Sequence, residues 1–246
     1  MDQKFQGKVA IVTGASKGIG ASIAKSLAAG GAALVINYAS SKTDAEVVVT
    51  AIKDTGGKAI AVKGDVSNKL EAKAIVDAAI AEFGRLDILV NNAGIYAFSP
   101  LEGVTEEHFH KIFNINVLGL LFMTQAAVGK MHEGGSIINI GSAITTMMPP
   151  GSSVYSASKS AVETITGVMA KELGGKKIRV NAVNPGPTQT EGTAQMGDGK
   201  GSPLVAQTPL GRFGKPEDIA KVVSFLASEE AGWVTGEILV ASGGLR

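Results

Sequence analysis

Short, strongly apolar runs alternate along the chain with longer stretches in which apolar residues recur every three or four positions. Most of the runs are almost continuously apolar, which is typical of strands buried on both faces of a parallel sheet. The runs predicted as strands are KVAIVTG (8–14), ALVINY (33–38), AIAVKGD (59–65), LDILVNN (86–92), SIINIGS (136–142), IRVNAVNPG (178–186) and EILVAS (237–242).

The stretches between these runs are predicted as helices: Ile19–Ala29, Lys42–Thr55, Lys69–Phe83, Glu106–Met131, Tyr155–Leu173 and Pro216–Ala227. Ser67 or Asn68 is the candidate N-cap of the third helix, and Pro216 with acidic residues opens the last one. Alternating strands and helices favour right-handed βαβ units in one doubly wound α/β sheet with helices on both faces. No linker or repeat interrupts the pattern, so we assign residues 1–246 to a single domain.

One long segment, residues 187–209, has neither pattern and carries Gly192, Gly197, Gly199 and Gly201. A loop of that length inside a compact domain is usually functional, and it often serves as a lid over the active site. We therefore expect a substrate lid, with a disordered insertion as the alternative.

Charge and cysteine content narrow the classes of function. The chain has 23 basic and 22 acidic residues, which gives no electrostatic footprint for nucleic acid or an acidic membrane surface. It has no cysteine, which excludes disulfides and thiolate catalysis and is compatible with a cytoplasmic location. We see neither a secretory signal nor an apolar run of the ~18 residues that a membrane span needs. His108 and His110 point to different faces of a helix, so we expect no metal site.

A glycine-rich turn, VTGASKGIGASIAKSLA, follows the first predicted strand and opens the first helix. Gly14, Gly18 and Gly20 allow the backbone to approach a pyrophosphate, for which the helix N-terminus supplies N–H donors. The spacing is neither the usual G-x-G-x-x-G nor that of a P-loop. Its place at the first strand–turn–helix favours nucleotide binding over an ordinary α/β turn.

The stretch SVYSASKSAVE places Tyr155 four residues before Lys159, just after a loop rich in Gly, Pro and Ser. Residues at i and i+4 share one face of a helix, so the ammonium lies beside the phenol. A nearby cation favours phenolate and lowers the phenol's pKa from about 10. This pairing indicates a tuned proton donor, whereas the alternative is a chance pair on a helix surface.

The ordered motifs of the chain resemble the classical short-chain dehydrogenase/reductase family. They are TGASKGIG (13–20), NNAG (91–94), NVLG (116–119), Ser142, YSASK (155–159) and NPGPTQT (184–190). The resemblance covers essentially the whole chain and implies a single Rossmann domain, a nicotinamide cofactor and hydride transfer between a ketone and a secondary alcohol.

The resemblance also implies the catalytic roles. Tyr155 would be the general acid or base, and Lys159 would tune it and bind the nicotinamide ribose. Ser142, which ends the fifth strand 13 residues before Tyr155, would hold the substrate oxygen. Asn116 would position a water for proton relay.

The residues that the resemblance and the glycine turn assign to the cofactor are Gly14, Ser16, Lys17, Gly18, Ile19, Asn37, Tyr38, Ala39, Ser40, Lys42, Asp65, Val66, Asn92, Ala93, Gly94, Tyr155, Lys159, Pro185, Gly186 and Thr188. Among them, Asn37 stands near the end of the second strand, at the position where an acidic residue would favour NAD. Because no carboxylate repels a 2′-phosphate there, and Lys17 and Lys42 can pair with one, we expect NADP(H), with NAD(H) as the alternative.

The expected pocket walls are residues 95–98 and 143–153 together with the lid. They contain Tyr96, Phe98, Met147, Met148 and Met196, and few charges beyond Glu191 and Asp198. Methionines adapt to irregular apolar shapes, so we expect a rather apolar ketone; ordinary core filling is the alternative.

Other functions stay open at this point. A 3-oxoacyl-[acyl-carrier-protein] reductase would need a basic docking patch, for which Lys130 and Lys171 are candidates. A sugar or polyol dehydrogenase is a variant of the ketone reductase, and a catalytically silent NADP-binding regulator belongs to a different class. The resemblance implies a homotetramer with the helices Glu106–Met131 and Tyr155–Leu173 at one interface. Ser242 departs from the family, which commonly has an aspartate at that position.

Overall fold

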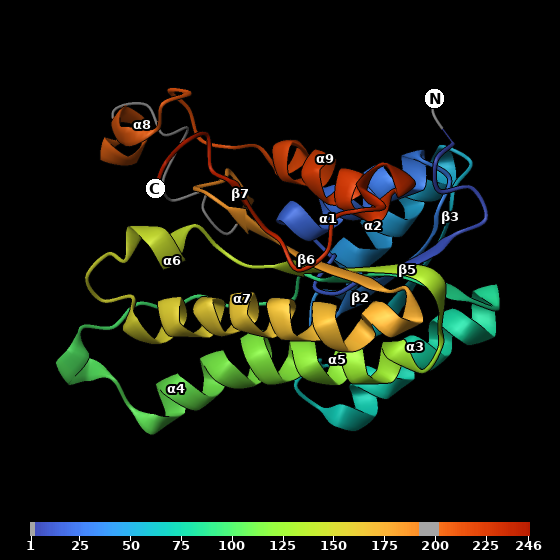
Figure 1. Ribbon diagram of the computed structural model, residues 1–246, viewed down its shortest axis with the longest axis horizontal. Coiled ribbons are helices and arrows are strands. Elements are labelled where there is room, and N and C mark those ends of the chain that lie inside the picture. The colour runs from blue at the N-terminus through green and yellow to red at the C-terminus, as the bar shows by residue number, and fades with distance from the viewer. Residues whose placement is uncertain (1–2, 192–201) are drawn as a thin grey trace.

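The structure is a computed structural model that describes residues 3–191 and 202–246. Its centre is a seven-stranded parallel sheet with the order β3-β2-β1-β4-β5-β6-β7 (Figure 1). The strands are β1 (Val9–Val12), β2 (Ala33–Tyr38), β3 (Lys58–Lys63), β4 (Leu86–Asn91), β5 (Met131–Ile140), β6 (Arg179–Pro185) and β7 (Ile238–Ala241). Every predicted run forms a strand, so the predicted doubly wound sheet is confirmed.

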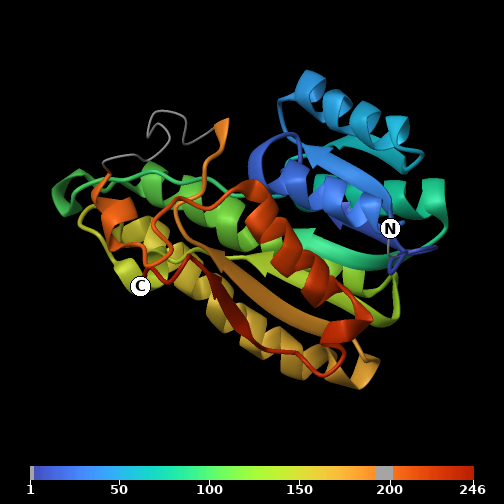
Figure 2. The same ribbon diagram turned by 90° about the horizontal axis from the view of Figure 1, so that it is seen from above.

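Helices cover both faces of the sheet. One face carries α1 (Gly18–Ala29), α2 (Lys42–Asp54) and α9 (Pro216–Ala227). The other carries α3 (Lys69–Phe83), α4 (Glu106–Phe113), α5 (Gly119–Val128) and α7 (Ser153–Leu173). Figure 2 shows α9 lying beside α1 on the first face. Two short helices, α6 (Ile144–Met147) and α8 (Pro203–Gln207), both lie near the same end of the molecule (Figure 1).

The continuous apolar runs explain why both faces are covered. Successive side chains of a strand point to opposite faces. Val12 and Val90 therefore enter the apolar layer under α1, while Ile11 and Leu89 enter the layer under α3 and α5. All four are fully buried. Each such side chain contributes about 1.5–3 kcal/mol relative to exposure, so both helix layers are held firmly.

The region 106–131 differs from the single predicted helix. Helix α4 is followed by a π-helical turn, Asn114–Leu118, and α5 ends at Val128. Strand β5 begins at Met131, which pairs with Leu86 before the register shifts. The prediction placed the strand at 136–142, because the polar residues His132 to Gly135 hide its first half. Lys130 consequently lies in the turn after α5.

The stretch Glu106–Val128 is long and apolar enough to cross a membrane by length and composition. The sequence analysis found no such run because polar residues interrupt it. Its apolar residues Leu120, Met123 and Ala127 are buried in the fold. In this structure the apolar character is accounted for by packing against α3 and the sheet.

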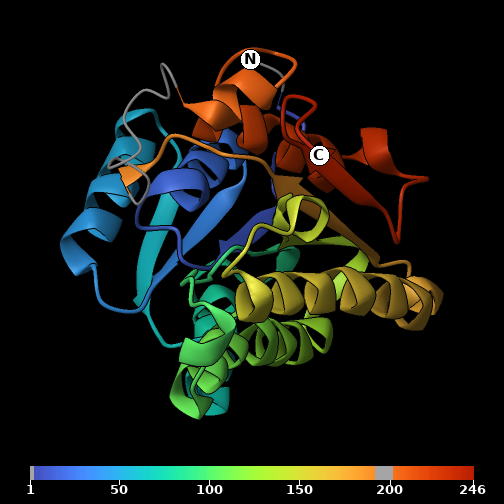
Figure 3. The same cartoon turned by 90° about the vertical axis from the view of Figure 1, so that its left-hand side faces the viewer.

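The strand order indicates at which edge of the sheet a ligand would bind. The chain leaves β1 toward β2 and β3, whereas it leaves β4 toward β5, β6 and β7. Ligands of open α/β sheets bind beyond the carboxyl ends of the strands at such a reversal. Figure 3 views the molecule from the side on which α6 and α4 lie in Figure 1, and that side contains the ends of β1, β4 and β5.

Candidate active site

The glycine turn between β1 and α1 is packed so tightly that side chains are excluded. A Cβ on Gly14 would lie 2.9 Å from the Cα of Ala93, and one on Gly20 would lie 2.5 Å from Asn92 Nδ2. Gly14 and Gly18 also have positive φ, +60° and +57°, which glycine adopts without a steric cost. Helix α1 has no side-chain cap and no acidic residue in its first turn. Its N–H groups and dipole are therefore available to an anion such as a pyrophosphate.

Thr13 joins this turn to the end of β4, a role that the sequence analysis missed. Its hydroxyl accepts hydrogen bonds from the backbone N–H groups of Asn92 (3.0 Å) and Ala93 (2.9 Å). Asn92 Nδ2 donates to the carbonyl oxygens of Thr13 (2.9 Å) and Gly14 (3.0 Å). Thr13 and Asn92 stand in two separate predicted motifs, and only the fold brings the motifs together.

Asn37 lies differently from the sequence interpretation. Its side chain is 1% exposed and does not face an open ribose site. Oδ1 accepts from Gly14 N (3.2 Å), while Nδ2 donates to the carbonyl oxygens of Gly64 (3.0 Å) and Val62 (3.3 Å). Asn37 therefore ties the glycine turn to the end of β3.

The exposed rim, meaning the surface directly beyond the end of β2, is formed by other residues that the sequence analysis assigned to the cofactor. Ala39 and Ser40 directly follow the strand and are exposed, as is Lys17 in the glycine turn. Lys42 is exposed and lies 3.5 Å from Glu46 on the same helix. These backbone and side-chain positions are accessible to a cofactor, whereas Tyr38 is buried.

Asp65 and Val66 form the end of the β3–α3 connection. Asp65 Oδ1 accepts from the N–H (2.9 Å) and the hydroxyl (2.7 Å) of Ser67, and Asn68 caps α3 by accepting from Leu70 N (3.0 Å). Asn68, rather than Ser67, is thus the N-cap. Val66 is buried against Gly119, where a Cβ would lie 2.6 Å from its side chain.

The π-helical turn presents Asn116 to the backbone that follows β4. Asn116 Oδ1 accepts from Ile95 N (2.8 Å), and Nδ2 donates to Ile95 O (2.9 Å) and to the Ser158 hydroxyl (3.1 Å). A Cβ on Gly94 would lie 3.2 Å from Asn116 Oδ1 and 3.5 Å from Lys159 Nζ. Three separate predicted motifs therefore meet at Gly94.

Lys159 is buried on the first turns of α7. Its Nζ donates to the carbonyl oxygen of Ile140, at the end of β5, at 2.8 Å. Burial lowers the pKa of Lys159 from 10.5 to about 8, because the charged form is poorly solvated there.

Tyr155 lies one turn before Lys159 and is hydrogen-bonded to the Ser142 hydroxyl. Burial raises the pKa of Tyr155, and the hydrogen bond with Ser142 opposes that change. The sequence analysis predicted a lowered pKa from the lysine. The direction differs here because Lys159 donates to Ile140 and the phenol is desolvated.

The chain segment after β6 closes the opposite wall of the site. Pro185 O accepts from Ala143 N (2.9 Å), which fixes the turn that carries Ser142. Gly186 lies against Ser242, where a Cβ would be 2.7 Å from the Ser242 Cα. Thr188 is buried, and its hydroxyl donates to Gly186 O (2.9 Å). Ser242 itself donates to Leu245 O (2.7 Å) and so holds the C-terminal turn.

A part-buried pair at the end of β6 was not found from the sequence. Asn184 Nδ2 donates to Glu163 Oε1 at 2.6 Å, which connects the end of β6 to α7. Asn184 is 1% exposed, and its Oδ1 has no hydrogen-bond partner among the described residues. Glu163 stands two turns after Tyr155 on the same helix, and this spacing is the one feature of the sequence that could have pointed to Glu163.

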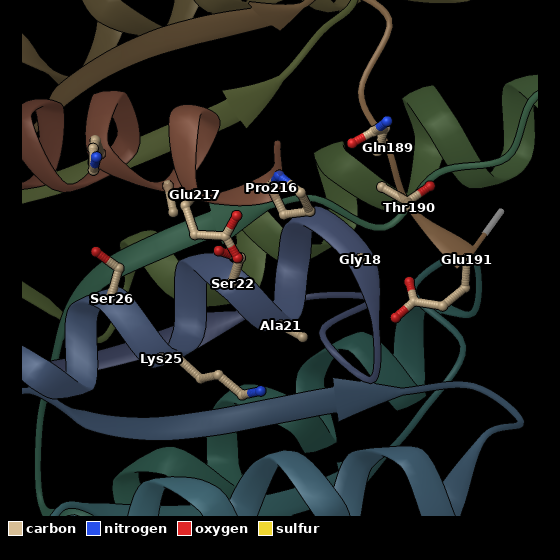
Figure 4. Close-up of a pocket in the computed structure, with 12 residues that line it drawn as sticks. Gly18, Ala21, Ser22, Lys25, Ser26, Gln189, Thr190, Glu191, Pro216 and Glu217 are labelled. Atoms are coloured by element: carbon tan, nitrogen blue, oxygen red, sulfur yellow. The ribbon is translucent and has the colours of Figure 1, made fainter. Parts of the chain in front are cut away.

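A hollow of about 730 Å³ opens beside Gly18, between α1, the start of α9 and residues 189–191 (Figure 4). Its lining includes Ser22, Lys25, Gln189 and Glu217. Because neither Ser142 nor Tyr155 lines it, it lies apart from the candidate catalytic residues.

The predicted lid is only partly described. Thr188 forms a β-bridge with Gly214, and residues 203–207 form α8. Met196, Asp198 and the four glycines of the predicted lid lie outside the described residues. Within the described ranges, no group of three or more His, Asp or Glu residues is placed to hold a metal ion.

Comparisons with known proteins extend over the whole chain. The family model described as enoyl-(acyl carrier protein) reductase matches residues 14–246. An uncharacterized oxidoreductase of Methylorubrum extorquens is 59% identical over 99% of both chains. A probable tetrahydroxynaphthalene reductase of Zymoseptoria tritici is 42% identical, covering 98% of this chain and 95% of the relative. The crystal structure of a short chain dehydrogenase from Burkholderia cenocepacia in complex with NADP superimposes with a TM-score of 0.94 at 38% identity, over 98% of this chain and 99% of that one.

Proposed function

The chain belongs to the classical short-chain dehydrogenase/reductase family and is an oxidoreductase, and from that premise we propose that it interconverts a ketone and a secondary alcohol with NADP(H). The observation that carries the proposal is the hydrogen bond between the Tyr155 and Ser142 hydroxyls, with the buried ammonium of Lys159 one helical turn away.

The described residues fit a dinucleotide. The Cβ-excluding turn at Gly14 and Gly20 and the uncapped start of α1 suit the pyrophosphate. Gly94 suits the nicotinamide end of the cofactor, because without a side chain its backbone is accessible beside Asn116 and Lys159. Exposed Lys17 and Lys42 at the rim favour a 2′-phosphate, and the Burkholderia cenocepacia relative binds NADP. When bound, NADPH supplies the hydride.

In this proposal the chain's own residues handle the proton. Ser142 and Tyr155 donate hydrogen bonds to the substrate carbonyl oxygen, which polarises it. The raised pKa of Tyr155 keeps the phenol protonated at neutral pH, so it can deliver its proton to the developing alkoxide. Lys159, which has a pKa of about 8, replaces that proton, and Asn116 holds the backbone of Ile95 beside it.

The test is a Tyr155→Phe variant, assayed by the loss of NADPH absorbance with a ketone. We expect turnover to fall by at least 100-fold, which is the lower range for removing a general acid. The variant should still fold and bind NADPH, measured by its melting temperature and by a binding titration, because the substitution removes only the phenol hydroxyl. Wild-type turnover in Tyr155→Phe would refute the assignment, and a parallel assay with NADH tests the cofactor preference.

We also propose that the chain assembles as a homotetramer. Exposed apolar side chains on the outer helices, Leu118 and Val168, support this, as does Trp233, which is fully exposed in the segment before β7. Light scattering after gel filtration tests it, and a monomer at micromolar concentration would contradict it.

A further inference from the structure

We propose that Tyr96 and Phe98 form an aromatic platform that selects planar aryl ketones at the site described above. This inference rests on the proposed ketone reductase function and specifies its substrate class. Two aromatic rings, those of Tyr96 and Phe98, gather at Tyr155. Its ring centroid lies 6.3 Å from that of Tyr96 and 6.1 Å from that of Phe98, at interplanar angles of 61° and 72°. The Tyr96 and Phe98 rings are 6.4 Å apart.

The platform is exposed although it is apolar. Tyr96 and Phe98 are 52% and 55% exposed, whereas most large apolar side chains of this chain are buried in the two layers beside the sheet. Exposed aromatic surface that gathers beside a reactive group marks a ligand site more often than it marks ordinary surface.

The backbone under the platform is fixed at both ends. Before Tyr96, Ile95 exchanges two hydrogen bonds with the Asn116 side chain, at 2.8 and 2.9 Å. After Phe98, Ser99 N donates to Gly151 O at 2.8 Å. The two rings therefore hold their places before a ligand arrives, and a ligand that stacks on them loses little free energy to loop ordering.

The neighbouring segments favour a neutral ligand. Residues 95–101 and 142–154 contain no Asp, Glu, Lys or Arg. Lys159, the buried cation at the site, already donates to Ile140 O. A charged substituent on the substrate would lose its hydration without gaining a counter-ion from these walls.

The distances define where the aryl ring must be. Aromatic pairs form at centroid separations of about 4.5–7 Å. A ring stacked on the side of Tyr96 or Phe98 that faces Tyr155 lies beside the Tyr155 side chain, whose hydroxyl meets Ser142. The platform therefore favours an aryl ring that is attached directly to the reacting carbonyl or fused to the ring that carries it.

The experiment compares acetophenone with cyclohexyl methyl ketone, which has a saturated ring of similar size. The measured quantity is the ratio of their kcat/KM values with NADPH, in the wild type and in Tyr96→Leu and Phe98→Leu. The two ketones differ in intrinsic reactivity, but that difference cancels when the ratio in a variant is divided by the ratio in the wild type. We expect the aryl preference to fall about 2- to 12-fold for each ring removed.

Two further variants make the comparison specific. Phe98→Tyr keeps a ring and should keep the wild-type ratio. Phe109→Leu removes an exposed aromatic side chain on α4, whose ring stacks on Phe113 at 4.3 Å and not on Tyr155, and should also leave the ratio unchanged. A ratio that moved equally in Phe109→Leu would overturn the platform.

A binding measurement separates the two proposals. Dissociation constants for both ketones are measured on the enzyme–NADP⁺ complex, in which no hydride can be transferred. Turnover of both ketones with a ratio that neither leucine variant changes would overturn the platform and leave the reductase function intact. If neither ketone is reduced, an acetophenone preference in binding that the leucine variants lose would support the platform and contradict the reduction of the ketones that it binds. Equal binding of both ketones by all variants would overturn the platform.

Discussion

Asn37→Asp is the substitution on which the sequence and the structure disagree most clearly. A carboxylate at the end of the second strand favours NAD by binding the ribose 2′-OH, so the sequence alone predicts that this change shifts the enzyme toward NADH. In the structure Asn37 Nδ2 donates to the carbonyl oxygens of Val62 and Gly64. A carboxylate has no N–H to donate, and it would be placed against two acceptors.

The magnitude follows from these contacts. The two lost hydrogen bonds contribute about 0.5–1.5 kcal/mol each, and a buried group left without its partner costs about 1–3 kcal/mol more. We therefore expect a loss of at least about 2 kcal/mol in the free energy of unfolding. For a chain of this size that lowers the melting temperature by at least about 4–8 °C. Asn37 Oδ1 also accepts from Gly14 N at 3.2 Å, so a carboxylate pushed away from the two carbonyl oxygens would shift the glycine turn, and NADPH and NADH should both bind more weakly.

The assay combines calorimetry with titration of both cofactors. Ala39→Asp is the matched control, because Ala39 is exposed directly beyond β2. There a carboxylate remains solvated, so stability should not change, while NADPH should bind more weakly than NADH through repulsion of the 2′-phosphate. An Asn37→Asp protein with an unchanged melting temperature and a gain in NADH affinity would show that Asn37 faces the ribose and that the structural reasoning is wrong.

The other predictions concern packing and protonation. Gly20→Ala should weaken NADPH binding by 10-fold or more in a fluorescence titration, since its Cβ would lie 2.7 Å from Gly14 O, whereas Gly129→Ala, which has open space, should bind normally. Glu163→Ala should lower the free energy of unfolding in urea by about 1.5–3 kcal/mol by leaving Asn184 Nδ2 without its charged acceptor, and Glu163→Gln should recover most of it. The pKa of Lys159 is lowered to about 8, so between about pH 8 and 10.5 the unfolded state binds more protons than the folded state. The free energy of unfolding should therefore rise by about 3 kcal/mol as the pH increases over this range. Lys159→Met should lack this rise, and an equal pH profile in both proteins would contradict the burial of the ammonium.

The sequence determined the architecture because burial on both faces leaves a direct trace in it. A strand between two helix layers is apolar at most positions, so all the strands were predicted, including β2 with the bounds that the structure shows. The first residue of a helix or strand could not be predicted where that end of the element is polar. The first half of β5 is polar and exposed, and the π-helical turn at Asn116 has no signal that distinguishes it from ordinary helix.

The sequence also determined which motifs take part in the site, because each motif is local. What only the tertiary structure decided is how the side chains of different motifs meet. Asn37 holds the glycine turn, and Thr13 joins that turn to the end of β4. Glu163 binds Asn184, and two rings of the β4 loop lie against Tyr155. These partners are far apart along the chain, and a hydrogen bond or a ring contact depends on distances that only the packing of the sheet and its helices fixes.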